Sequence, residues 1–197
     1  AIDRADVLKQ ARAATERLRA GRPLSLLDGV PVAVKDEVDQ VPYGTTVGTS
    51  FLGQTPATQD ATVVARLRAA GALLLGKTNM HEIGINPDGF NEHYGIIRNP
   101  YNLQCHAGGS SNGSAAAVAA GFCPVAIGAD GGGSIRIPAA LTGLVGLKAT
   151  FGRVSERGAA PLTWSMGHLG PIGATVSDVA LVYACIAGPD PDDPNSL

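Results

Sequence analysis

Three consecutive glycines, residues 131–133, lie between an apolar segment and Ser134, which begins a second apolar segment. Glycines permit a tight turn in which neighbouring backbone N–H groups converge on one point. A serine beside such a turn can cap the following helix. It can also be a nucleophile next to an oxyanion hole, which is the arrangement that acyl transfer needs. The segment therefore predicts a strand, a glycine turn and a helix, with two interpretations of Ser134.

Strands and helices alternate along the rest of the predicted chain. Apolar side chains at helical spacing, together with glycine stops, predict helices over residues 3–20, 61–70, 110–121, 134–142 and 178–187. Asp60 and Ser177 are the expected caps of two of them. Strands are expected over 30–35, 72–76 and 124–130, and a long irregular loop over 83–109. This order favours a layered α/β fold with a mixed or mostly parallel sheet.

The composition is that of a globular protein. The 197 residues are 45% hydrophobic and 16% charged, with a net charge of −2 and no basic stripe. The charge distribution argues against nucleic acid or a membrane surface as the main partner. Cys105, Cys123 and Cys185 form no CxxC pair, which favours reduced thiols in a cytoplasmic protein. No apolar run is long enough to span a membrane, and no cofactor is indicated.

Two local patterns suggest other chemistry. Residues 71–78 match the phosphate-loop pattern GxxxxGK[ST], but such a loop follows a strand and opens a helix. Here a helix comes first, and Ala-Leu-Leu-Leu favours a strand. Cys105-His106 together with His81-Glu82 is a loose metal candidate, although loop or surface histidines are the simpler interpretation, and no metal is expected.

Lys35 and Ser110 are the other candidate reactive residues. Lys35 ends an apolar strand, where a lysine usually extends to the surface. If it points inward, burial favours the neutral amine, which could act as a base. Ser110 belongs to the glycine–serine cluster of residues 108–114, which is either a capped helix start or a source of a hydroxyl that relays a proton between a lysine and Ser134.

These three residues carry a resemblance to a known family. Lys35 in VAVKD, Ser110 in GGSSNGSAAAVAAG and Ser134 in GADGGGSIRIPA resemble, in this order, the three catalytic elements of the amidase signature family. The 24 positions from Ser110 to Ser134 agree with the spacing in that family. GALLLGKTNMHE, YGIIRNPYN and GLKATFGRVS agree as well, so the resemblance covers most of residues 26–188. MHEIG and GADGGGSIRIP are most similar to its fatty acid amide hydrolase-like branch.

The resemblance implies a fold and a domain organisation. The family has an α/β/α sandwich with a mixed β-sheet, of which this chain would supply the N-terminal and central part. Residues 1–25 are expected to form an N-terminal helix, and residues 26–197 an amidase signature core that is incomplete at its C-terminus. Because family domains are considerably longer, we expect a fragment, a nicked product or one piece of a larger assembly.

The resemblance also implies catalytic roles. Ser134 would be the nucleophile, Ser110 would bridge it to Lys35, and neutral Lys35 would take the proton. The peptide between Gly109 and Ser110 would be cis, a form that costs about 3–4 kcal/mol before a residue other than proline.

Other residues would support the nucleophile. The resemblance implies supporting roles for Ser111, Asp130 and Arg136, the two charged residues holding the glycine loop. The family often has threonine at the position of Ala129, so the hydrogen bonds behind the serines are expected to differ here. The oxyanion hole would consist of the N–H groups of Gly131, Gly132 and Gly133, together with that of Ser134.

The expected activity is hydrolysis of a linear carboxylic amide through an acyl-enzyme, with a hydrophobic acyl group preferred. The alternatives are the glutaminase subunit of a tRNA-dependent amidotransferase, an inactive interaction module and a nucleotide-binding module. Expected partners are a small-molecule amide, the remainder of an amidase domain or a second chain, and a second copy in a homodimer. Nucleic acid is not expected, and the full-length protein could still associate with a membrane.

Overall fold

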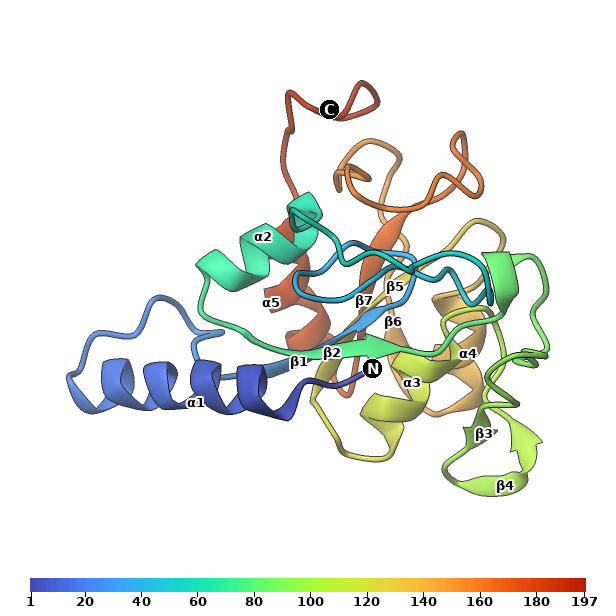
Figure 1. Cartoon of the computed structure of the whole chain (residues 1–197), viewed down its shortest axis with the longest axis horizontal. Coiled ribbons are helices and arrows are strands. Elements are labelled where there is room, and N and C mark those ends of the chain that lie inside the picture. Colours follow the sequence, from blue (N-terminus) through green and yellow to red (C-terminus); the bar gives the residue numbers. More distant parts are fainter.

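A five-stranded mixed sheet forms the centre of the computed structural model, which describes all residues from 1 to 197 (Figure 1). The strand order is β2-β1-β5-β7-β6. β2, β1 and β5 run parallel, whereas β7 is antiparallel to both of its neighbours. A separate hairpin joins β3 and β4. The strands are β1 (Pro31–Lys35), β2 (Leu73–Thr78), β3 (Arg98–Asn99), β4 (Asn102–His106), β5 (Val125–Ala129), β6 (Val145–Gly146) and β7 (Leu169–Gly173).

Helices cover both faces of the sheet, which gives the expected α/β/α sandwich with a mixed sheet. α2 and α5 pack on one face, α3 and α4 on the other, and α1 lies against the edge strand β2. None of them is both long and apolar enough to cross a membrane. The helices are α1 (Arg4–Arg19), α2 (Thr62–Ala69), α3 (Asn112–Ala119), α4 (Arg136–Leu141) and α5 (Val176–Ile186), with a 3₁₀ turn, η1, at Glu82–Gly84.

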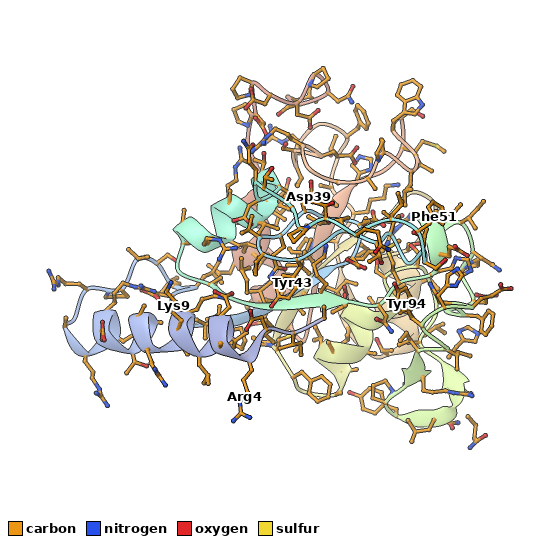
Figure 2. The ribbon with its side chains drawn as sticks, viewed as in Figure 1. Arg4, Lys9, Asp39, Tyr43, Phe51 and Tyr94 are labelled. Carbon is orange, nitrogen blue, oxygen red and sulfur yellow. The ribbon has the colours of Figure 1, made fainter.

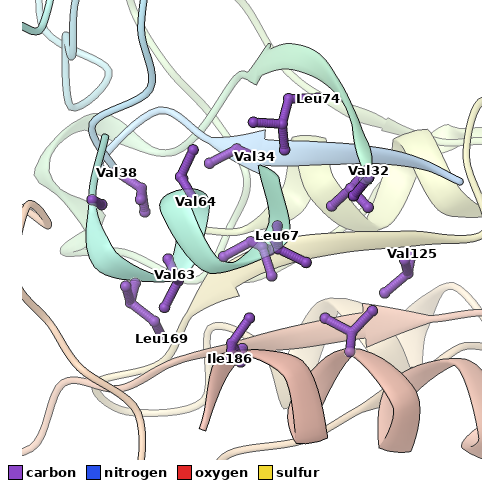
Figure 3. Packing of buried hydrophobic residues seen from close by; sticks show 14 of the residues in the cluster. Val32, Val34, Val38, Val63, Val64, Leu67, Leu74, Val125, Leu169 and Ile186 are labelled. Carbon is purple, nitrogen blue, oxygen red and sulfur yellow. The ribbon is translucent and has the colours of Figure 1, made fainter. Parts of the chain in front are cut away.

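The side chains of β1 alternate between the two helical layers, as the period of a strand requires. Val32 and Val34 are fully buried in the larger core together with Leu67 of α2 and Ile186 of α5 (Figure 3). Ala33 packs in the other layer, with α3. Lys35, two residues after Ala33, is therefore directed toward the layer that contains α3.

Small residues let α3 approach the sheet closely. Ala33 of β1 and Ala126 of β5 pack against Val118 of α3. Gly128 of β5 faces Ser111 at the start of the helix, and a Cβ atom on Gly128 would lie only 2.9 Å from the Ser111 Oγ. The sheet therefore has room for α3 only because these positions carry small side chains or none.

Polar contacts hold α1 to the segments on either side of β1, although the helix extends well beyond the sheet (Figure 1). The Asp3 side chain caps the helix, and the Asp3 N–H donates to the Tyr43 hydroxyl at 2.8 Å. Near the other end, Arg17 donates two hydrogen bonds to the buried Asp28. Arg4 points away from the body of the molecule (Figure 2).

The structure corrects two predicted helix caps and one predicted loop. Asp60 does not cap α2; it accepts hydrogen bonds from the Val41 N–H and from Arg68 instead. α5 begins at Val176, where Thr175 and Asp178 form a capping box in place of Ser177. The predicted loop over residues 83–109 contains the β3–β4 hairpin. Contacts with Val41 and Arg68 replace the cap predicted for Asp60, whereas at α5 a local capping box begins two residues before the predicted cap.

Replacing Leu67 by alanine tests the larger core. Leu67 is fully buried between α2, the sheet and α5, so the substitution leaves a cavity. We expect the free energy of unfolding to fall by about 2–5 kcal/mol in urea denaturation. Leu26→Ala is the matched control, because Leu26 is 82% exposed and its loss is expected to change stability by less than about 0.5 kcal/mol. Equal losses in both variants would contradict this assignment of the core.

Candidate active site

The carboxyl ends of the neighbouring parallel strands β1 and β5 define the site. β1 ends at Lys35, and β5 leads through Ala129 into the glycine turn. Crevices outside the carboxyl ends of parallel strands are the usual ligand sites of α/β sheets. A pocket of about 770 Å³ lies here and is lined by Lys35, Ser110, Ser134 and the glycines of the turn.

Lys35 points into the protein and not to the surface. It is 1% exposed, and its Nζ donates to the Ser110 Oγ at 2.7 Å and to the Ala129 carbonyl at 3.5 Å. The Nζ also lies 2.8 Å from the Oε2 of Glu37. The structure therefore brings together two of the three predicted reactive groups and adds a carboxylate to them.

Ser134 lies beside Ser110 in the same pocket. Its Oγ accepts a hydrogen bond from the Ser110 backbone N–H at 3.1 Å, whereas the two hydroxyls do not bond to each other. Ser134 does not cap α4, because Ile135 occupies the N-cap position. The interpretation of Ser134 as a helix cap is therefore excluded, and its hydroxyl is oriented toward Ser110.

The peptide between Gly109 and Ser110 is trans, contrary to expectation. The single cis peptide of the structure joins Val41 to Pro42. The chain turns before Ser110 through positive φ angles of 78° at Gly108 and 62° at Gly109, which glycine adopts readily. This turn presents the Ser110 hydroxyl to Lys35.

Asp130 anchors the glycine turn. The carboxylate is completely buried and accepts hydrogen bonds from the Gly133 N–H at 2.6 Å and from the Arg136 guanidinium at 2.9 and 3.0 Å. Lys148 lies 3.5 Å away. Burial alone would raise the pKa of Asp130, but the hydrogen bonds from Arg136, Ile135 and Gly133 outweigh it and lower the pKa to about 2. These contacts fix the glycine turn to the start of α4.

The backbone donors of the turn divide into two groups. The N–H of Gly133 is occupied by Asp130. Those of Gly131, Gly132 and Ser134 make no hydrogen bond within the protein. Of the expected oxyanion donors, the N–H of Gly133 is therefore the one that already donates to a group within the protein.

Ser111 fixes the end of β5 from the helix side. Its Oγ donates to the Ala129 carbonyl at 3.0 Å and accepts from the Ala129 N–H at 3.1 Å. Ala129, where the family often has threonine, is therefore held through its backbone and not through a side-chain hydroxyl.

Four further residues in or beside the pocket were not predicted from the sequence. Glu37 contacts Lys35, and Lys148 joins the Gly131 and Met166 carbonyls at 3.0 and 2.9 Å. Burial, with Asp193 and Glu37 nearby, raises the pKa of Glu156 to about 7. The fourth residue is His168, whose Nδ1 lies 2.7 Å from the Met166 carbonyl.

The local signals were weak for all four residues. Glu37 follows a predicted strand, and Lys148 lies in a segment for which no element was predicted, so no periodicity indicates the direction of either side chain.

The residues of the loose metal candidate and of the phosphate-loop match form other contacts in the structure. His81 Nε2 lies 3.6 Å from Asp88, whereas Cys105 is exposed on the β3–β4 hairpin. No three histidine, cysteine or acidic side chains are grouped so that they could hold a metal ion. The GxxxxGK[ST] match forms strand β2, and its Lys77 is buried in an ion pair with Asp36 at 2.9 Å.

Residues 2–197 match the family profile described as Amidase, and the chain belongs to the amidase signature family. It is 46% identical to a fatty acid amide hydrolase from Arabidopsis thaliana over 197 residues, which cover the whole chain and 32% of that relative. It is 48% identical to a glutamyl-tRNA(Gln) amidotransferase subunit from Symbiobacterium thermophilum over 95% of the chain and 38% of that relative. The chain therefore spans about a third of the length of these curated relatives.

Solved structures show the same fold. The peptide amidase from Stenotrophomonas maltophilia has a TM-score of 0.94 and 40% identity, covering 100% of this chain and 41% of that chain. A structure from work on a vestigial protein complex and the origins of an s-triazine catabolic enzyme has a TM-score of 0.97 and 44% identity, covering 100% of this chain and 43% of that chain.

Replacing Asp130 by asparagine tests the anchor of the glycine turn. A carboxyl whose pKa is lowered in the folded state stabilises the protein above about pH 4 and loses this effect between about pH 4 and pH 2. We expect Asp130→Asn to lower the free energy of unfolding by about 2 kcal/mol at pH 7, and the difference to shrink over that acidic range. Urea denaturation at several pH values measures it.

Asp192→Asn is the control, because that side chain is exposed. A difference for Asp130→Asn that is independent of pH would show that the carboxylate charge is not what holds the turn.

Proposed function

We propose that this protein hydrolyses a linear carboxylic amide through an acyl-enzyme on Ser134. The observation that carries the proposal is the chain of contacts in which Lys35 Nζ donates to Ser110 Oγ at 2.7 Å and Ser110 N–H donates to Ser134 Oγ at 3.1 Å. Membership of the amidase signature family supports it, as do relatives named for amide hydrolysis.

The proposed reaction begins with proton transfer along the three residues. Ser134 Oγ attacks the amide carbonyl carbon as its proton passes to Ser110, and the proton of Ser110 passes to neutral Lys35. Catalytic hydrogen bonds often tighten only in the complex with substrate, so we expect the two serine hydroxyls to meet there. The carbonyl electron pair becomes an oxyanion, for which the N–H groups of Gly131, Gly132 and Ser134 are the donors still available.

Collapse of this intermediate breaks the C–N bond. The leaving amine receives the proton back through Ser110, and water then hydrolyses the ester on Ser134. Asp130 does not take part in these transfers, since its oxygens are occupied by Arg136 and the backbone of the turn. Its role is to hold the donors in place before the negative charge develops.

Apolar side chains at the pocket support a hydrophobic acyl group in the substrate. Leu162, Trp164 and Met166 line the pocket and are 37%, 69% and 58% exposed, and Ile85, also in the lining, is 77% exposed. Burying such surface against a substrate is favourable in proportion to its area. The names of the hydrolase relatives agree with this preference.

The glutaminase subunit of a tRNA-dependent amidotransferase is the second candidate function. The 48% identity to a glutamyl-tRNA(Gln) amidotransferase subunit favours it as strongly as the hydrolase relatives favour the first. This function would use the same serines and lysine, but would need a partner protein that receives the ammonia. Cytoplasmic location, a homodimer and the domain boundaries remain predictions.

Labelling with a fluorophosphonate probe tests the nucleophile. In the full-length protein we expect one adduct on Ser134, located by peptide mass mapping, and its loss in Ser134→Ala. Lys35→Ala is expected to slow labelling by about 10²-fold or more, because the hydroxyl then lacks its base. Ser177→Ala, which removes an exposed hydroxyl, is the control. A folded protein that remains unlabelled, or that is labelled at another residue, would contradict the proposed mechanism.

A substrate comparison separates the two candidate functions. We expect the full-length protein alone to release ammonia from a primary fatty acyl amide, and to show little activity on free glutamine. Ammonia release is followed with a coupled assay, with Ser134→Ala as the blank. Glutamine hydrolysis that appears only after the other subunits of an amidotransferase are added would favour the second function.

A further inference from the structure

A buried carboxylate lies beside the lysine that the proposed reaction uses. Glu37 follows β1 by two residues, and its Oε2 is 2.8 Å from the Lys35 Nζ. The two side chains are 6% and 1% exposed. Apart from this contact, that oxygen has no hydrogen-bond partner. Burial of a charge without such a partner is strongly unfavourable.

Two groups from separate segments thus fix the end of the lysine side chain. Ser110, before α3, accepts from the Nζ at 2.7 Å, and Glu37 lies within ion-pair distance of the same atom. A lysine side chain is flexible and has many rotamers. Holding its amino group by a hydroxyl and a carboxylate restricts it to the position that a proton relay needs.

Three other acids near the pocket have partners elsewhere. Asp130 is bonded to Arg136 and lies 3.5 Å from Lys148, and Asp36 pairs with Lys77. Asp193 accepts from the Glu156 backbone N–H. Glu37 is the acid that lies within ion-pair distance of the Lys35 Nζ.

Two further charged residues lie near this pair. The pKa of Glu156, about 7, is raised by burial first and then by the charges of Asp193 and Glu37. Burial lowers the pKa of Lys77, on the neighbouring strand β2, and the charge of Glu37 is one of those that oppose this lowering. Both residues remain in place in the variants used below.

We infer that Glu37 is a positioning residue for the proposed hydrolysis, holding Lys35 against Ser110 and supplying the negative charge that balances Lys35 once it is protonated. This inference rests on the proposed function. In the acylation step the Ser134 oxygen bonds to the carbonyl carbon, its proton passes to Ser110, and the Ser110 proton passes to Lys35. Glu37 exchanges no proton and remains a carboxylate throughout.

The neighbouring residue in the sequence provides an internal comparison. Asp36 pairs with Lys77 at 2.9 Å, a lysine–carboxylate contact closely similar to that between Lys35 and Glu37. Neither Asp36 nor Lys77 contacts Ser110 or Ser134. A loss of stability common to both lysine–carboxylate contacts can thus be separated from an effect on the reaction.

The pH dependence of amide hydrolysis by the full-length protein tests the inference. In Glu37→Gln the protonated lysine loses its counter-charge, which has two consequences. The maximal kcat falls tenfold or more with little change in KM, because the charge on Lys35 develops during acylation. The acid limb of the kcat/KM profile moves to lower pH by one unit or more, because the ammonium loses its proton more readily. Asp36→Asn keeps the acid limb of the unmodified protein.

Glu37→Asp provides a second variant that retains the charge but shortens the side chain. We expect its kcat to fall while the acid limb stays near its original pH. If Glu37→Gln fails to fold, a Glu37→Asp variant with the kcat of the unmodified protein overturns the inference, and a lowered kcat with an unchanged acid limb supports it.

Two results for Glu37→Gln would overturn the inference while leaving the proposed function intact. One is a pH profile of unchanged position, and the other is an equal displacement in Asp36→Asn. Failure of the proposed function is recognised separately, because the unmodified protein would then carry no fluorophosphonate adduct on Ser134.

Discussion

Parallel pairing of β1 with β5 is the constraint on which the rest of this structure depends. The register places Val34 opposite Ile127, so both strands end at the same edge of the sheet. Lys35 and the glycine turn are brought together by this register alone, although almost a hundred residues separate them in the sequence. A shift by one residue would turn Lys35 toward the α2 and α5 layer, because successive side chains of a strand point to opposite faces.

Contacts with Asp130 are the main interactions that fix the conformation of the glycine turn. Glycines lose more conformational freedom on folding than other residues, so three in succession would leave a loop without a preferred shape. The buried carboxylate offsets this by binding the Gly133 N–H, while Arg136 neutralises its charge. Lys148 adds a contact from the segment after β6 to the Gly131 carbonyl. The conformation of the turn is therefore fixed by the charged residues that contact it, and not by the glycines themselves.

The sequence allowed the layered fold and the main parallel strands to be predicted, because helical and strand periodicities are local properties. It also located Lys35, Ser110 and Ser134 as candidates, and the structure places all three in one pocket. β6 and β7 were missed. β6 has two residues, and β7 reads Leu-Gly-Pro-Ile-Gly, a composition more typical of a turn.

The roles of Glu37, Lys148 and Glu156 in the site depend on tertiary contacts. Each lies in a loop or at the end of a strand, and neither spacing nor residue type reveals which of many neighbours it will meet. The trans peptide before Ser110 could not be predicted from the sequence either. Left-handed φ angles at Gly108 and Gly109 produce the turn there.

The absence of a side chain at Gly128 has a consequence for the distance between the sheet and α3. Ser111 rests on this glycine, and Ser110 is its neighbour in the chain. Any larger residue at 128 would act as a spacer that lifts the start of α3 from the strand. The hydroxyl of Ser110 would then move away from Lys35, which is fixed to a different strand. A position that takes no part in the proposed proton transfer thus sets the distance between the Ser110 hydroxyl and the Lys35 Nζ.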